Sequence, residues 1–562
     1  MENKNCKSCK NNFTIEPDDF AFYEKIKVPP PTLCPDCRQM RRYAWRNERT
    51  LYRRNCDLCA KSTVTIYSPN KPYKVYCVGC WWGDGWDTTL FGRDFDFSRP
   101  FFDQFKELQH DVPRMALLTK NSVNSEYTNH SGDNKNAYIS FSCFGNENLS
   151  YCTWVMNSRD CADCSYVYEK GERLYECIDS QSSYQSQYCI LINNCSNCYY
   201  CYDVNGSSDC FLSSNLRGQR YYFKNQQYSK EDYFEKIKQY DLSLHSVREK
   251  LFAEFIEMME KAAIHKYTVG ERNVASLGNL LFNCKNVTYA YDLDRGEDCK
   301  YIYGSLDTKD SVDLYHVGIK SELCYDSHGC TRVYNTQFCH LCYDNSGLMY
   351  CDSCQNSQNL FGCVSVKKGE YMILNKKYSK EEYEALKVKI VEHMKTTGEY
   401  GEFFPPSIAP VYYNETRGAV YMPLSKEEVL ARGWHWEDKV PGVFGKETVK
   451  LADMPDSITN VLPEYAANIF VCAACSKNFN ITGDEFSFYK REKIPLPRKC
   501  ADCRERVRWS LRLPRKLWHR SCMCDLTNHD HTNKCPNEFE TAYSPDKTEK
   551  IFCERCYQQE VL

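Results

Sequence analysis

The chain has 562 residues, a formal net charge of −3 and 36 cysteines. Its length predicts about three or four domains. The charge argues against a generally polycationic protein, so any polyanion binding must come from local basic patches. No signal-like segment opens the chain and no apolar run is long enough to span a membrane. We therefore expect a cytoplasmic protein with reduced cysteines and not a disulfide-rich secreted one.

The first hundred residues predict a module with two metal sites. Two Cys-x2-Cys pairs supply the four soft donors that tetrahedral Zn²⁺ prefers: Cys6, Cys9, Cys34 and Cys37. Between the pairs, residues 13–15 and 20–23 predict a β-hairpin around a turn at 16–19. A second set follows with the proportions of a zinc ribbon, formed by Cys56, Cys59, Cys77 and Cys80.

An arginine-rich segment follows Cys37, and residues 38–54 predict a helix with a local charge of +6. Residues 504–520 repeat this charge near the other end of the chain. Arginine forks suit phosphates, so we take seven residues as candidate contacts for nucleic acid or a protein partner: Arg38, Arg41, Arg42, Arg46, Arg504, Arg508 and Arg512. The alternative is that they neutralise zinc–thiolate charge and pair with acidic groups of the same chain.

The middle of the chain is repetitive. Tyr/Cys-rich motifs recur every 23 to 25 residues in two arrays, 120–228 and 271–378, which end alike at positions 150 residues apart. Repeats of this length bury their apolar faces only by stacking, which predicts a duplicated β-solenoid. Capping boxes at Ser229 and Ser379 predict helices that cover the solenoid ends, within segments 229–270 and 379–397.

Nineteen cysteines lie in these arrays, ten in the first and nine in the second. Reduced cysteine is a small core residue that stacks well, so we favour core stacking over further metal binding or redox chemistry. Residues i and i+3 of a strand point to opposite faces, so we expect Cys-x2-Cys pairs here to chelate only across a turn. The scattered histidines, such as His316, His328 and His340, are interpreted as structural.

The last part of the chain repeats the first. Residues 398–465 predict a linker with one short helix that begins after Ser425. Residues 466–562 predict a second double zinc module, displaced by 466 positions from the first. Its sites are Cys472, Cys475, Cys500 and Cys503, and then Cys522, Cys535, Cys553 and Cys556. Cys524 is the alternative to Cys522, and His529 and His531 lie in an inserted loop.

Both ends resemble a known domain. The pattern Cys-x2-Cys-x3-Phe-x-Ile, Phe-Tyr, and Pro-x2-Cys-Pro-x-Cys-Arg is similar to the probable zinc-ribbon domain of bacterial proteins, over about 40 residues per copy, and the arrangement of knuckle, hairpin and helix resembles a treble-clef finger. The order of modules and arrays resembles a group of bacterial multi-zinc-finger proteins over most of the chain. This resemblance implies zinc and the architecture, but no activity, partner or catalytic residue.

These observations predict a multidomain, mainly β protein with treble-clef or zinc-ribbon modules flanking the solenoid. Four thiolates close the zinc tetrahedron, so the four Zn²⁺ ions should be structural. We find no catalytic constellation and expect neither an enzyme nor a small-molecule substrate. The favoured function is a scaffold for protein or nucleic-acid partners. Two alternatives stay open: RNA or DNA binding through the arginine helices, and glycan binding or cleavage by the solenoid.

Overall fold

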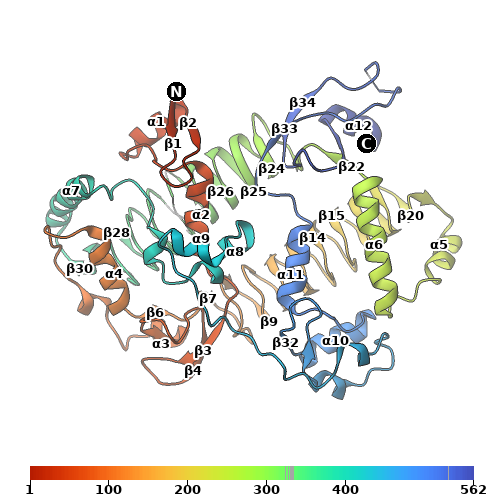
Figure 1. Ribbon diagram of the computed structural model, residues 1–562, viewed down its shortest axis with the longest axis horizontal. Coiled ribbons are helices and arrows are strands. Elements are labelled where there is room, and N and C mark those ends of the chain that lie inside the picture. Colours follow the sequence, from red (N-terminus) through yellow and green to blue (C-terminus); the bar gives the residue numbers. More distant parts are fainter. Residues whose placement is uncertain (323, 327, 330–333, 530) are drawn as a thin grey trace. The chain divides into compact units, whose positions relative to one another are not determined.

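The computed structural model describes residues 1–322, 324–326, 328–329, 334–529 and 531–562, with the backbone alone for 316–320. It is mainly β, with solenoid coils in the middle of the chain and cysteine clusters near both ends, as the sequence predicted (Figure 1). The chain forms two compact units. The first unit comprises Met1–Leu117, Thr268–Val440 and Arg515–Leu517; the second comprises Leu118–Tyr267, Pro441–Pro514 and Trp518–Leu562. Each unit therefore combines one cysteine-rich module with the array that lies farther from it in the sequence.

The solenoid of the second unit is built from short parallel strands. Successive coils pair Ile190 with Tyr202 and Tyr202 with Ser214. Side chains 12 positions apart therefore lie over one another, and Asn197 donates to the Asp209 carboxylate in this way. The strands are β7 (Thr119–Lys120), β8 (Ser131–Gly132), β9 (Lys135–Tyr138), β10 (Glu147–Ser150), β11 (Thr153–Val155), β12 (Arg159–Ala162), β13 (Ser165–Tyr168), β14 (Ile178–Gln181), β15 (Ile190–Asn193), β16 (Ser196–Tyr199), β17 (Tyr202–Asn205), β18 (Ser208–Phe211), β19 (Ser214–Arg217) and β20 (Arg220–Phe223).

Each repeat predicted from the sequence therefore covers two coils and not one. The backbone turns at every third residue, which takes a positive φ, as at Asn197, Tyr200 and Asp203. One coil is a residue longer than its neighbours. The extra residue lies at a turn, where Glu169 and Lys170 both have positive φ. This single insertion explains the longest repeat spacing of the first array. Asn and Asp recur at the turning positions because their short polar side chains tolerate this conformation.

The first unit contains the second array. Its strands are β23 (Gly270–Glu271), β24 (Leu277–Phe282), β25 (Lys285–Lys300), β26 (Tyr303–Val312), β27 (Tyr315–Ser321), β28 (Gln358–Phe361) and β29 (Glu370–Ile373). The same register relates its coils, which pair Tyr291 with Tyr303 and Tyr303 with Tyr315. The repeat motif expected at 323–326 lies partly outside the described residues, since Leu323 is not described.

One residue in every three points into the solenoid, and many of these residues are cysteines. Cys195, Cys198 and Cys201 are all buried in the core of the first array. These cysteines straddle turns, because a residue with positive φ lies between them and returns the next side chain to the interior. Every solenoid cysteine that the structure describes is buried, and none belongs to a group of metal-ligand geometry among those residues.

Two of the solenoid histidines pack within the first unit. His328 and His340 are buried, and their rings stack with centroids 5.0 Å apart. His340 Nδ1 also lies 2.9 Å from Asp352 Oδ1. These contacts support the structural interpretation of both residues. The side chain of His316 lies outside the described part of the chain.

Helices follow both arrays, as the capping boxes predicted. Ser229 and Ser379 accept hydrogen bonds at the starts of α5 (Lys230–Ile237) and α7 (Lys380–Thr397). The last coils end in antiparallel strands β21 (Gln226–Gln227) and β30 (Lys376–Lys377). Tyr233 of α5 and Phe255 of α6 (His245–Lys261) pack on the first array, whereas Tyr383 of α7 packs on the second.

The modules differ from prediction in two elements. Residues 17–25 form helix α1 and not a strand, because Pro17 occupies the first helical turn with Asp18 and Asp19. The hairpin pairs β1 (Glu2–Asn5) with β2 (Asn12–Ile15) instead. The arginine helices, α2 (Pro35–Tyr43) and α11 (Ala501–Ser510), are also shorter than predicted.

The remaining module elements follow in chain order. In the first unit they are α2 (Pro35–Tyr43), β3 (Tyr52–Asn55), β4 (Ser62–Thr65), β5 (Val75–Tyr76), α3 (Val78–Trp82), η1 (Thr88–Phe91), α4 (Phe101–Asp111) and β6 (Arg114–Met115). In the second unit they are β22 (Ile264–Lys266), η4 (Leu451–Asp453), η5 (Pro463–Ala467), β31 (Phe470–Val471), β32 (Asn478–Phe479), α10 (Gly483–Glu492), α11 (Ala501–Ser510), β33 (Trp518–Ser521), β34 (Glu538–Thr541), β35 (Lys550–Phe552) and α12 (Glu554–Val561).

The segment expected to be a linker is partly core. Phe403 and Phe404 are buried and pack on Trp45. Short helices follow: η2 (Pro406–Ile408), η3 (Tyr413–Glu415), α8 (Gly418–Tyr421) and α9 (Lys426–Ala431). Ser425 caps α9 as predicted. Among the described residues, no helix combines the length and apolar character needed to cross a bilayer.

Candidate metal centres

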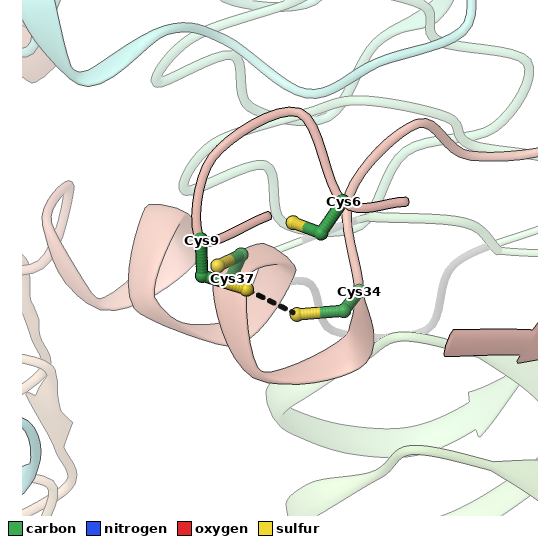
Figure 2. A group of neighbouring side chains, drawn as sticks. All are labelled: Cys6, Cys9, Cys34 and Cys37. Atoms are coloured by element: carbon green, nitrogen blue, oxygen red, sulfur yellow. Dashed lines mark hydrogen bonds between the residues drawn. The ribbon is translucent and has the colours of Figure 1, made fainter. Parts of the chain in front are cut away.

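The first cysteine cluster joins a hairpin to a helix. Cys6 and Cys9 lie on the turn between β1 and β2, and Cys34 and Cys37 lie at the start of α2 (Figure 2). The four sulfur atoms lie within 4.8 Å of one another, with Cys9 Sγ 3.7 Å from Cys34 Sγ. Lys10 takes a positive φ and donates its N–H to the Cys6 carbonyl, which folds the turn back toward the helix. This is a knuckle that presents both sulfurs to one point.

The other three clusters repeat this construction. Each second pair begins at the residue before a helix, where the N-terminal dipole favours anionic sulfur. These N-cap residues are Cys34, Cys77, Cys500 and Cys553. In each of these clusters one sulfur of the first pair lies close to one of the second: 3.9 Å for Cys59 and Cys77, 3.8 Å for Cys475 and Cys500, and 3.9 Å for Cys535 and Cys553.

Backbone N–H groups also point at the sulfurs. The amides of Cys77, Cys500 and Cys553 each lie 3.2 Å from the sulfur of Cys56, Cys472 and Cys522, respectively. Burial opposes ionisation of Cys472, but backbone hydrogen bonds outweigh it and lower the pKa of this thiol to about 6. For Cys56 the same balance lowers the pKa to about 7. In the same clusters burial raises the pKa of Cys500 to about 11, and the hydrogen bond with Cys77 raises that of Cys80 to about 12, so the thiols of one cluster ionise unequally.

All sixteen cysteines predicted as ligands lie in the four expected groups. The fourth group contains Cys522, as we preferred, together with Cys535, Cys553 and Cys556. Cys524 does not replace Cys522; it belongs to a fifth group, with His529, His531 and Cys556. The chemistry of four closed thiolate sets fits a tetrahedral metal ion with a preference for sulfur.

The arginines of α2 point into the first unit. Arg38 Nε lies 2.6 Å from Asp313 Oδ2, and Arg42 also reaches Asp313. Arg41 and Arg42 both pair with Asp326. The side chains of Arg42, Asp313 and Asp326 are fully buried. Charged groups this deep are stable only when they are paired and hydrogen-bonded.

The second unit repeats these pairs. Arg504 Nε lies 3.0 Å from the carboxylate of Asp163, and Arg508 lies 3.0 Å from both Asp163 and Glu176. Arg512 pairs with Asp179 at 2.7 Å. Figure 1 shows α11, which carries Arg504 and Arg508, beside strands β14 and β15 of the first array.

The two sets of pairs are equivalent by sequence. Arg38 and Arg504 are 466 positions apart, the offset of the modules, and Asp313 and Asp163 are 150 apart, the offset of the arrays. Each arginine also lies over a tyrosine at matched positions, Tyr301 at 5.3 Å and Tyr151 at 4.8 Å from the ring centroid. The duplicated element is therefore a module together with the array surface that it contacts.

These contacts change the interpretation of the arginines. Arg38, Arg41, Arg42, Arg46, Arg504 and Arg508 are buried, and the ion pairs above lie within their own units. Arg46 differs from its counterpart Arg512, because its carboxylate partner is Glu48 of its own module, which also pairs with Arg417. The guanidinium groups we considered for phosphate binding thus contact carboxylates of the chain, in line with the alternative that we left open.

The second unit also contains a cavity of about 400 Å³. It is lined by residues of the first array, α6 and the C-terminal module, including Tyr175, Phe252 and Leu511. Glu176 lies at its wall; burial raises the pKa of its carboxyl to about 7, although Arg508 opposes this shift. Burial therefore favours the protonated form of this carboxyl, and Arg508 favours the ionised form.

No family is matched. Comparison of the sequence with models of known protein families gives no match, and comparison with curated proteins gives none at a significant level. The four cysteine clusters therefore stand on geometry, and the resemblance to a zinc-ribbon family is not confirmed by these comparisons.

Sequence reasoning missed two groups of residues that the structure brings together. The first comprises the acidic partners Asp163, Glu176, Asp313 and Asp326, which the shared offset of 150 residues could have revealed. The second comprises His529 and His531, which we noticed in the inserted loop but assigned to no site. Their spacing from Cys524 was the available signal.

Proposed function

We propose that the protein is a zinc-dependent interaction scaffold without catalytic activity. Each module uses two Zn(Cys)4 sites to hold hairpins against helices, and the arginine helix, α2 or α11, then contacts a solenoid array through buried arginines. The observation that carries the proposal is the repetition of this contact in both units, Arg38 with Asp313 and Arg504 with Asp163.

The proposed zinc ions are structural because each cluster offers four thiolates and leaves no position for a reacting water. Folding of such sites is coupled to metal binding. A chelator that removes zinc should therefore expose the modules to protease while the solenoid coils resist cleavage. Cleavage at equal rates with and without zinc would contradict a structural role.

We propose a protein partner for the scaffold. The buried arginines of α2 and α11 pair with carboxylates of the chain. Four Zn(Cys)4 sites at −2 each would change the formal charge from −3 to −11. A charge of this sign disfavours binding to phosphate backbones. Parallel solenoid arrays offer extended surfaces of the kind that repeat proteins use for binding.

Purification from the native cell at moderate salt tests the partner class. We expect a defined protein to co-purify in constant ratio and to remain bound after nuclease treatment. If RNA or DNA co-purifies and nuclease treatment dissociates the complex, the result would support nucleic-acid binding instead. Variants of the module arginines cannot test nucleic-acid binding, because loss of these buried residues would also disturb the fold. A variant with a changed charge at Lys389, an exposed residue of α7, is a suitable control for the effect of surface charge on the co-purified partner.

A further inference from the structure

The inserted loop of the C-terminal module brings three additional donors to one place. In the N-terminal module, three positions separate Cys56 from Cys59; in the C-terminal module, thirteen separate Cys522 from Cys535. The insertion carries Cys524, His529 and His531. The ligand atoms of these residues and of Cys556 all lie within 4.8 Å of one another. Cys556 belongs to the fourth cysteine cluster as well.

We propose that the C-terminal module holds a fifth metal ion, bound by Cys524, His529, His531 and a Cys556 thiolate that bridges it to the fourth ion. Two thiolates and two imidazoles form a closed set of four ligands, which is typical of structural Zn²⁺. The inference rests on the proposed fourth zinc site, because the two sites share Cys556.

The histidines are oriented as metal ligands. His529 Nδ1 lies 3.1 Å from Cys524 Sγ, while its Nε2 lies 3.4 Å from Oε2 of Glu560 without the geometry of a hydrogen bond. Glu560 is four residues after Cys556 on α12, so both lie on the same face of that helix. A metal-bound histidine ordinarily donates its other N–H to such a carboxylate or to a carbonyl, which fixes the ring.

His531 shows the same arrangement with the opposite ring nitrogen. Its Nδ1 lies 2.8 Å from the backbone carbonyl of Asn533 and donates to it, so Nε2 carries the free lone pair. That Nε2 atom is buried and makes no hydrogen bond within the described part of the chain. A buried imidazole nitrogen without a partner is costly, and a metal ion would satisfy it.

Charge and burial favour a second ion. Cys522, Cys524 and Cys556 are each fully buried, and Cys535 and Cys553 are nearly so. Five thiolates and one Zn²⁺ would place a charge of −3 in this small volume, whereas a second Zn²⁺ would reduce it to −1. The N-terminal module has no equivalent insertion, so its second site should hold one ion.

Native mass spectrometry of the full chain measures the metal count directly. We expect five zinc ions in the wild type, four in Cys524→Ser and four in a His529→Asn, His531→Asn double variant. The control is His519→Asn in the same module, because His519 is exposed and contacts Glu538 and Glu540; it should retain five. Thermal unfolding of each variant checks that the remaining chain is folded.

Cadmium substitution provides a second readout that does not depend on variants. In ¹¹³Cd NMR we expect two resonances of this module to show scalar coupling through the shared Cys556 sulfur. Four ions in the wild type, unchanged in Cys524→Ser, would overturn the fifth site but leave the four sites of four cysteines standing. Fewer than four ions in the wild type would instead count against the proposed function itself.

Discussion

The two units make the same contact from parts of the chain that are distant in sequence. In the first unit Arg38 and Arg42 converge on Asp313, and in the second Arg504 and Arg508 converge on Asp163. Tyr23 contacts Tyr325 in the first unit as Tyr489 contacts Tyr175 in the second. Because both partners are duplicated at constant offsets, this contact defines the unit, and the modules are not independent appendages.

The differences between the units lie at the margins of this contact. Arg512 reaches Asp179 of its array, but the matched position in the other array is Gly329, and Arg46 pairs with Glu48 of its own module instead. The second difference is the inserted loop with its histidines. The buried ion pairs that both units share should therefore set the stability of both. The Arg512–Asp179 pair, which we call the outer pair, and the inserted loop occur only in the second unit.

The largest effect is expected from the cysteines of the proposed zinc sites. Replacing Cys34 and Cys37 by Ser should remove one zinc ion and unfold the N-terminal module, and replacing Cys500 and Cys503 should do the same at the other end. Structural zinc in finger peptides contributes roughly 10–16 kcal/mol of binding free energy. Elemental analysis and limited proteolysis measure both results.

The matched control is a Cys-x2-Cys pair of the solenoid, Cys161 and Cys164. Both are buried in the core of the first array. Their replacement by Ala should lower stability through loss of packing but leave the metal count unchanged. Loss of zinc from this variant would show that solenoid cysteines bind metal.

Next in size is the buried arginine contact. Arg504→Met leaves Asp163 with an incomplete partner set, and Arg38→Met does the same to Asp313, so each should lower the free energy of unfolding by about 3–5 kcal/mol. Urea unfolding in the presence of zinc measures the cost. Adding Asp163→Asn to Arg504→Met should cost less than the sum of the two single variants. Additive costs would show that the two groups do not interact.

The pH dependence should differ between the units because of Glu176. Burial raises the pKa of this carboxyl to about 7, so the folded unit binds the proton more tightly than the unfolded chain does. The contribution to stability is complete below the unfolded pKa near 4.5 and declines as the pH rises through 7. As the pH is raised from 6 to 8, the free energy of unfolding should therefore fall less for Glu176→Gln than for the wild type. Equal slopes for the two proteins would contradict this account.

The smallest effect is expected from moving the outer pair between units. Gly329→Asp restores in the first unit the carboxylate that Asp179 supplies in the second. Gly329 has a φ of +71°, which Asp tolerates, but an added Cβ would lie 3.1 Å from Leu341 Cδ2. We expect a change in unfolding free energy of at most about 1 kcal/mol, because a new ion pair and this close contact oppose each other. A larger gain would show that a second carboxylate improves the pairing of Arg46 well beyond what Glu48 provides.

The sequence predicted the parts of the structure that depend on local spacing. The cysteine quartets, the solenoid and the capped helices followed from ligand spacing, repeat length and capping residues such as Ser379. The coil length was wrong because two coils with alternating motifs resemble one long repeat. The strand expected at 20–23 is helix α1 because Pro17 and its acidic neighbours fix a helical start.

The placement of the modules could not be predicted in this way. No local pattern near Arg38 indicates that its carboxylate partner lies 275 residues away. The pairing depends on how the arrays fold and on which module each array contacts. The histidine group was missed because the spacing of His529 and His531 from Cys524 is only part of the signal, and the fourth member, Cys556, lies on α12.

The metal content of the purified full-length protein tests the central claim most directly. We expect elemental analysis to find at least four zinc ions per folded chain, and five when the bridged site is filled. A folded, monodisperse protein that carries no zinc would contradict the account, because the hairpins and helices at both ends would then be held by other contacts.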